Sequence, residues 1–204
     1  MADQLYLSLW YPNFKLIALP SALEKVMAQF AAVGGSPRVK AASVYPISWN
    51  ESPVYQQVYR EEDAEAAVPK HAIAAAIEML HEDYAYEFEL TWPLWIPEVG
   101  DGLDPVWKQE PSIVRITGLG PEFDEGAYEQ NGQIRVDFGM DTPFLHEDID
   151  LDSEAATHVK QNVQLLVDFT NAVQKHCGIS TRLLWSESGE SLAEKLIARL
   201  QQVN

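Results

Sequence analysis

Three runs of alternating apolar and polar residues constrain the fold of this chain more than any other feature of its sequence. Residues 85–92, 114–117 and 134–138 each place an apolar side chain at every second position. A period of two predicts β-strands with one buried and one wet face, as in an antiparallel sheet. The wet faces carry acidic and basic side chains that we expect to pair across neighbouring strands: Glu87 and Glu89 with Arg115 or Arg135.

Helical periodicity surrounds these strands and sets the fold class. Helices are expected over residues 21–33, 69–80, 153–177 and 191–203, and further strands over residues 5–10, 39–45 and 181–185. Residues 52–59 fit a helix that starts at Ser52-Pro53 or a strand equally well. The prediction is a single α+β domain over residues 1–204. It has a mixed sheet of five or six strands, a central antiparallel meander and helices mainly on one face. Two ferredoxin-like halves are the architectural alternative.

Aromatic–proline steps end three of the expected strands. Trp10-Tyr11-Pro12, Tyr45-Pro46 and Trp92-Pro93 are each followed by more large apolar residues, including Trp49 and Trp95. Proline lacks the N–H that a ladder requires, so the strands are expected to finish or bend there. If these corners meet at one edge of the sheet, they form an aromatic binding surface. Its residues would be Trp10, Tyr11, Tyr45, Trp49, Trp92 and Trp95. The alternative is that the rings plug one end of the core.

Composition excludes several classes of function. The 204 residues carry a formal net charge of −17, without a cluster of lysine or arginine, so binding to nucleic acid is not expected. No run of about 18 apolar residues exists, so no membrane partner is expected either. A single cysteine and an N-terminus without a secretion signal favour a cytoplasmic location. The charge itself indicates either solubility or attraction to a basic protein partner.

A cluster of acidic and histidine side chains precedes the long helix that is expected at residue 153. The spacing of Asp148, Asp150 and Asp152 matches the opening of a calcium loop, but Ser153 replaces the glycine that the sixth position needs. Capping of the helix N-terminus, with Asp152 or Ser153 as the N-cap, is the stronger explanation of these carboxylates. A transition-metal site formed by His146, Asp148 and His158 is a weaker alternative, because the spacing is not a known ligand pattern.

The remaining reactive groups carry no catalytic motif. Cys177 follows His176 at an expected helix C-terminus, where the helix dipole opposes a thiolate, so it is interpreted as a buried structural residue. Residues 185–189 lack the first glycine of a nucleophile elbow, and residues 118–121 lack the third glycine of a dinucleotide loop. No cofactor is therefore expected.

Three hypotheses of function follow from these observations. The first is a non-catalytic, acidic cytosolic module that recognises a basic protein partner, a character shared with immunity and inhibitor proteins. The second is a small-molecule binder or enzyme with a pocket lined by Trp10, Tyr45, Trp92 and Trp95. The third is a metal-dependent enzyme that uses residues 141–158. The absence of a catalytic motif favours the first.

Overall fold

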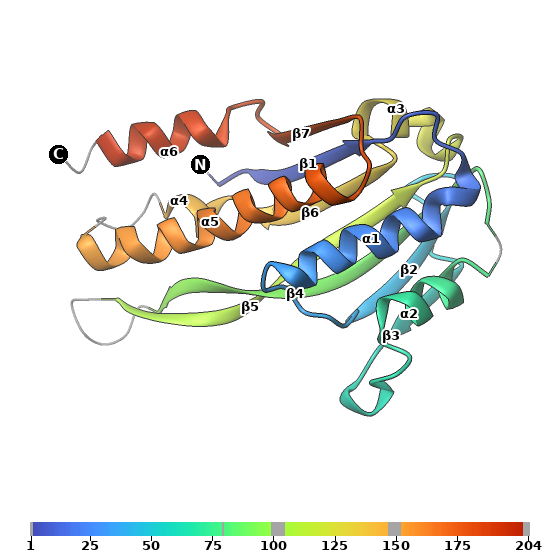
Figure 1. Ribbon diagram of the computed structural model, residues 1–204, viewed down its shortest axis with the longest axis horizontal. Helices are drawn as coiled ribbons and strands as arrows, with labels where there is room; N and C mark the ends of the chain where they lie inside the picture. Colours follow the sequence, from blue (N-terminus) through green and yellow to red (C-terminus); the bar gives the residue numbers. More distant parts are fainter. Residues whose placement is uncertain (1, 79, 99–104, 147–151, 202–204) are drawn as a thin grey trace.

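The alternating runs build one antiparallel sheet in the computed structural model (Figure 1), which describes residues 2–78, 80–98, 105–146 and 152–201. Its strands are β1 (Gln4–Trp10), β2 (Ala41–Pro46), β3 (Tyr55–Val58), β4 (Tyr84–Glu98), β5 (Val106–Leu119), β6 (Ile134–Met140) and β7 (Thr181–Ser186). They lie in the order β3-β2-β4-β5-β6-β1-β7. The α+β class and the central meander, β4 to β6, are confirmed. Every neighbouring pair is antiparallel, so the sheet is not mixed, and its seven strands are not divided into two halves.

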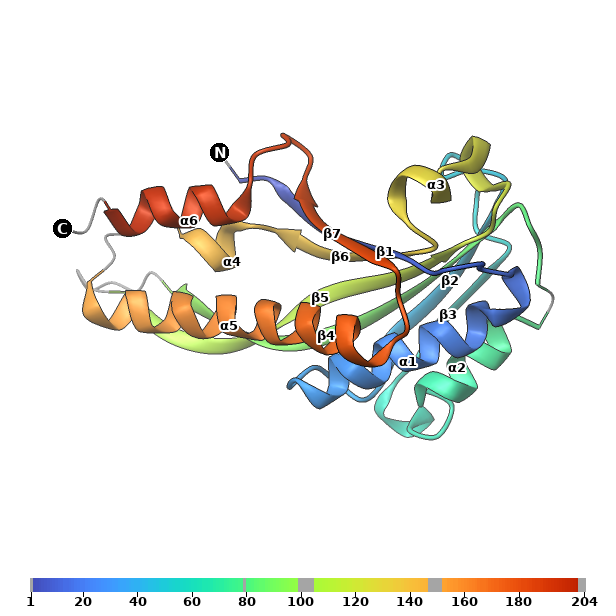
Figure 2. The ribbon, with the colours of Figure 1, turned by 45° about the horizontal axis from the view of Figure 1, so that its top comes forward.

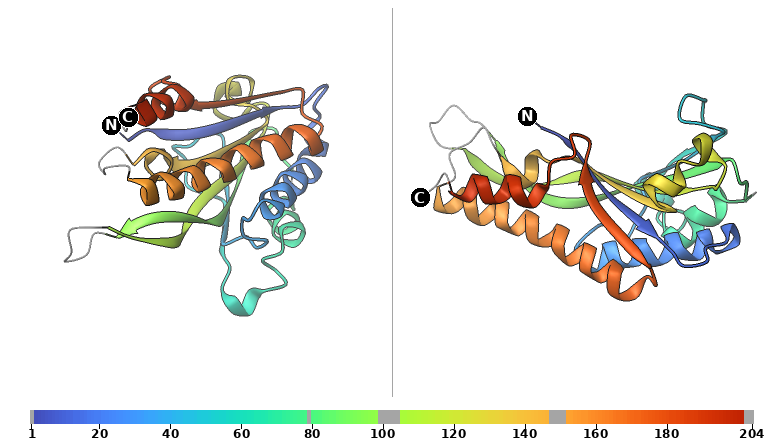
Figure 3. Two further views of the ribbon diagram at one scale, coloured as in Figure 1. Left: turned by 60° about the vertical axis from the view of Figure 1, so that its left-hand side comes forward. Right: turned by 90° about the horizontal axis from the view of Figure 1, so that it is seen from above.

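The helices gather mainly on one face of this sheet, as expected (Figure 2 and the right-hand view of Figure 3). They are α1 (Leu19–Ala32), α2 (Pro69–Ala76), α3 (Tyr128–Asn131), α4 (Thr142–Leu145), α5 (Ser153–His176) and α6 (Leu192–Gln201). The two views place α1, α2 and α5 on the same side of the sheet, with α3 on the other side. One face of the sheet is thus covered by long helices and the other carries only short elements.

Burial follows the period of each element. The inward positions of the central strands are almost completely buried and pack under the helices: Leu5, Leu7, Leu9, Phe88, Leu90, Ile116, Ile134 and Val136. Asp152 caps α5, as predicted, because its Oδ1 accepts the N–H groups of Glu154 and Ala155 at 2.9 and 2.8 Å. No helix in the described part of the chain has both the length and the apolar character needed to cross a membrane.

The first helix begins earlier than the sequence predicts. It starts at Leu19 instead of Ser21, with Pro20 in its first turn, where a missing N–H costs nothing. Leu19 is fully buried against Gly118 of β5, where an added Cβ would lie 2.7 Å from a Leu19 methyl group. The start of this helix is thus packed into the core against a glycine.

The strands decide one open alternative and correct one expectation. Residues 52–59, which fitted a helix or a strand, contain the edge strand β3 and no helix. β4 continues through Trp92-Pro93 to Glu98, so this strand does not finish at its aromatic–proline step, and β5 begins at Val106. Pro93 lies opposite Pro111, in a part of the hairpin where neither β2 nor β6 extends alongside. Proline is tolerated there because no outer neighbour needs its N–H.

Candidate functional site

Two of the three aromatic–proline corners lie at the same end of the sheet. β1 and β2 are separated by four antiparallel steps and therefore point in the same direction. β1 ends at Trp10 and β2 ends at Pro46, next to the start of β4. Figure 1 shows both strand ends on the side of the molecule that carries α3. The third corner differs, because β4 runs the other way and does not end at its proline.

The aromatic residues predicted from sequence therefore divide into separate groups. Trp92 is 1% exposed and packs in the core against Phe30 and Phe138, with ring centroids 5.4 Å away in each case. The Trp95 ring lies against the imidazole of His158 in α5, with ring centroids 4.1 Å apart. The pocket expected between Trp10, Tyr45, Trp92 and Trp95 is not assembled by this arrangement. Trp10, Tyr45 and Trp49 remain at or next to the ends of β1 and β2, and Tyr11 directly follows β1.

Three segments meet at this end and form what we call the acidic loop cluster: residues 46–51, 82–84 and 120–131. Backbone hydrogen bonds tie them together, from Glu122 N to Glu82 O and from Gly120 N to Tyr84 O, both at 2.8 Å. Gly120 is required by this contact, because an added Cβ would lie 2.2 Å from the carbonyl oxygen of Glu82. Segments far apart in the sequence are thus held as one surface.

Ile47 is the most unusual residue of the acidic loop cluster. Its φ is +63°, which β-branched residues rarely adopt, and its side chain is 60% exposed. Two backbone hydrogen bonds of 2.7 Å hold it: its N–H donates to Asp83 O, and its carbonyl accepts from Asp124 N. Asp124 and Glu125 also have positive φ, at +48° and +58°. Strained backbone around an exposed apolar side chain is a feature that clusters at functional sites.

Negative charge is concentrated in the acidic loop cluster. Its segments contain seven carboxylates and no lysine or arginine: Glu51, Glu82, Asp83, Glu122, Asp124, Glu125 and Glu129. Five of these residues are exposed and two are half-buried. Within the described structure, no hydrogen bond or ion pair engages the side chains of Glu122, Glu125 and Glu129. Uncompensated charge of one sign attracts the opposite sign over about a Debye length.

Aromatic rings form the floor beneath these carboxylates. The Trp49 ring lies 5.3 Å from that of Tyr45 and meets the buried Phe123 edge-on at 5.0 Å. Tyr128 packs on the same group. Trp10 joins from β1, where its indole N–H donates to the carbonyl of Glu129 at 3.1 Å. Trp49, Tyr45 and Trp10 are half-buried, so the floor remains partly accessible.

The open face of the sheet continues from this floor. The Arg135 guanidinium of β6 lies 5.4 Å from the Trp49 ring centre and 5.2 Å from that of Tyr6. Tyr6 stacks in turn on Trp185 at 4.6 Å. Burial, with Asp137 and Glu187 nearby, raises the pKa of Tyr6 to about 12. The Arg135 guanidinium, next to the acidic loop cluster, is thus engaged by aromatic rings of the same chain.

Charged groups further along the open face pair as the alternating pattern predicts. Arg115 Nε contacts Glu89 Oε1 at 3.0 Å, and its Nη1 lies 4.0 Å from Asp137. Glu87 is half-buried beside them, and burial raises the pKa of its carboxyl against the opposing effect of Arg115. The charges in the middle of this face are therefore largely balanced, in contrast to those of the acidic loop cluster.

The residues proposed from sequence as a metal site are only partly brought together. His158 stacks on Trp107 and His146 meets the same ring edge-on, both with centroids 5.1 Å away. Asp148 lies outside the described residues. Among the residues that are described, no three His, Cys, Asp or Glu side chains are placed to hold a metal ion. The two histidines are thus connected through an indole ring in this part of the structure.

Other reactive groups have structural surroundings. Asp141 is 2% exposed and receives the Lys195 ammonium at 3.0 Å and the N–H of Asp3 at 2.9 Å. Cys177 is 3% exposed, and burial raises the pKa of its thiol to about 11. Both features confirm the interpretation of Cys177 as a buried residue in its neutral form.

Comparison with known proteins does not change this picture. No family model, no curated protein and no solved structure matches the chain. The site is therefore defined by its geometry. Sequence reasoning missed Ile47, Phe123, Tyr128 and Arg135 as parts of it. The available signal was the long acidic segment between Gly118 and Gly132, whose position next to the second corner depends on the fold.

Proposed function

We propose that this chain is a non-catalytic cytoplasmic binding module that recognises a basic protein through the acidic loop cluster. The observation that carries the proposal is the group of seven carboxylates without a lysine or arginine, set around the exposed Ile47. The single buried cysteine is compatible with a reducing compartment.

The surface combines the two components that protein interfaces use. Carboxylates around the rim speed association with a cationic partner and select against acidic ones. Ile47 and the accessible parts of Trp49 and Tyr45 supply apolar and aromatic area, and aromatic side chains dominate binding energy at such surfaces. Backbone hydrogen bonds fix these groups before binding, which lowers the entropic cost of association.

The second hypothesis, a small-molecule pocket of Trp10, Tyr45, Trp92 and Trp95, has less support, because Trp92 belongs to the core. The third, a metal-dependent enzyme, depends on Asp148, which is not among the described residues. Protein recognition is the hypothesis that needs only groups already placed together.

Affinity capture from a lysate of the source cells tests the proposal. The bait is the full chain, compared with a variant that carries Glu122→Gln, Glu125→Gln and Glu129→Gln. The expected result is capture of a basic protein by the unmodified chain, with loss of most of the captured protein for the variant and at 0.5 M salt. These glutamines keep the shape of exposed side chains, so the fold is retained.

A matched control separates the site from total charge. The control variant removes the same number of negative charges from another exposed acidic segment, through Glu61→Gln, Glu62→Gln and Glu65→Gln. This control is expected to capture the partner as well as the unmodified chain. Equal loss for both triple variants, or capture of no basic protein at low salt, would contradict the proposal.

A further inference from the structure

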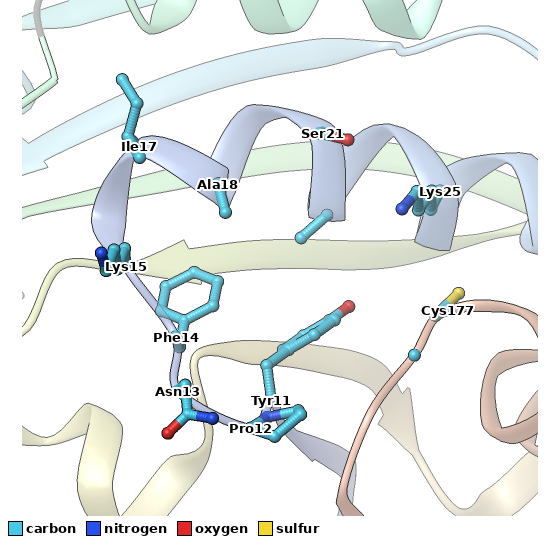
Figure 4. A pocket seen from close by; sticks show the side chains of 12 residues that line it. Tyr11, Pro12, Asn13, Phe14, Lys15, Ile17, Ala18, Ser21, Lys25 and Cys177 are labelled. Atoms are coloured by element: carbon cyan, nitrogen blue, oxygen red, sulfur yellow. The ribbon is translucent and has the colours of Figure 1, made fainter.

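A pocket lies on the helix side of the sheet. It has a volume of about 400 Å³ and lies between the segment that follows β1, the first turns of α1 and the end of α5. Figure 4 shows the rings of Tyr11 and Phe14 at its base, with Lys15 on one side and Lys25 and Cys177 on the other. The centroids of the two rings are 5.6 Å apart and the ring planes are tilted by 40°, so the rings together form an apolar wall.

The charge of this pocket is opposite to that of the molecule. The twelve residues that line it include two lysines and no aspartate or glutamate, although the chain has 31 acidic and 14 basic residues. Lys15 and Lys25 are exposed at its rim. A local positive charge beside an apolar wall suits an anion that also carries an apolar group.

One polar group within the pocket has no partner. The hydroxyl of Tyr11 is buried and makes no hydrogen bond in the described structure. A buried hydroxyl without a partner destabilises the fold, and an acceptor that reaches it after a side-chain shift removes that cost. Figure 4 shows the hydroxyl pointing toward the side of Lys25 and Cys177. Burial raises the pKa of Tyr11, so the hydroxyl remains a proton donor at neutral pH.

We propose that this pocket binds a small organic acid that joins an apolar body to one carboxylate. The apolar body lies against the rings of Tyr11 and Phe14 and the side chain of Ala22. The carboxylate pairs with the ammonium of Lys25 and, once a side-chain shift uncovers the buried Tyr11 hydroxyl, accepts a hydrogen bond from it. Lys15 adds attraction at the opposite rim. This site is independent of the acidic loop cluster, since no residue is shared.

Titration of the protein with 2-naphthoate, measured by isothermal calorimetry, tests the proposal. The same titration with 2-naphthamide provides the uncharged counterpart. The expected result is binding of the carboxylate at least tenfold tighter than that of the amide. Tyr11→Phe keeps the ring and removes only the hydroxyl, and it is expected to weaken naphthoate binding about fivefold. Lys25→Gln is expected to weaken binding about fivefold as well, because it removes one partly exposed charge pair.

Lys70→Gln provides the control, since it removes an exposed lysine of α2 that does not line the pocket. Its affinity for naphthoate is expected to equal that of the unmodified chain. In chains with labelled alanine methyl groups, contacts between naphthoate protons and the Ala18 and Ala22 methyls are expected by NMR. Absence of those contacts, equal binding of acid and amide, or equal loss for Lys70→Gln would overturn the proposal.

Discussion

Trp92 offers the sharpest test of how the structure divides its aromatic residues. The side chain is 1% exposed and lies against Phe30, Phe138 and Phe144. Truncation to alanine leaves a cavity within close-packed rings, so Trp92→Ala is expected to lower the free energy of unfolding by about 4 kcal/mol. This loss is a large part of the 5–15 kcal/mol typical of a domain.

A second substitution at the same position separates ring volume from polarity. The Trp92 indole N–H is buried without a hydrogen-bond partner in the described structure. Trp92→Phe leaves a cavity of roughly 40 Å³, which costs about 1 kcal/mol at 24 cal/mol per Å³. Removing the unpaired N–H recovers about 1 kcal/mol. The two effects nearly cancel, so the expected change in stability is within about 1 kcal/mol of zero.

Urea unfolding at pH 7, monitored by circular dichroism, measures the free energy of unfolding of both variants. An m-value equal to that of the unmodified chain confirms that the folded and unfolded states are comparable. The reasoning is refuted if Trp92→Phe is as costly as Trp92→Ala, because the indole N–H must then have a partner. A cost below about 1 kcal/mol for Trp92→Ala would also refute it, since the ring would not be part of the core.

Two further predictions concern charged groups. Glu87→Gln is expected to raise the free energy of unfolding at pH 7, because burial raises the pKa of this carboxyl in the folded state and its ionisation opposes folding. The gain disappears below about pH 4, where the carboxyl is protonated in both states, and it is measured by urea unfolding across that range. Lys195→Met is expected to cost about 3 kcal/mol, because Asp141 is left buried without its ammonium partner. Adding Asp141→Asn restores part of that stability, whereas equal stability of the single and double variants would contradict the assigned pair.

Local rules predicted the features that depend on neighbouring residues alone. The period of two identified the central strands. The sequence limited the N-cap of α5 to Asp152 or Ser153, and the structure shows that it is Asp152. The ion pair between Glu89 and Arg115 followed from the same alternation. Each of these features is decided within a few residues or by adjacent strands.

Features that depend on the whole sheet were not accessible in this way. The strand was expected to finish or bend at Trp92-Pro93, but β4 continues because its outer neighbour β2 stops before Pro93. Trp10 and Tyr45 lie at the same end of the sheet only because β1 and β2 point in the same direction. The positive φ of Ile47 results from hydrogen bonds to segments more than 30 residues away. Strand order and long-range backbone contacts therefore define the site.

Zero-length carboxyl–amine cross-linking of the captured complex, followed by mass spectrometry, tests the central claim most directly. The acidic loop cluster predicts links between lysines of the partner and Glu122, Glu125 and Glu129, with few links to the exposed Glu61 and Glu62. Links concentrated on the segment with Glu61 and Glu62, or spread evenly over all exposed carboxylates, would contradict the claim that this surface binds the partner.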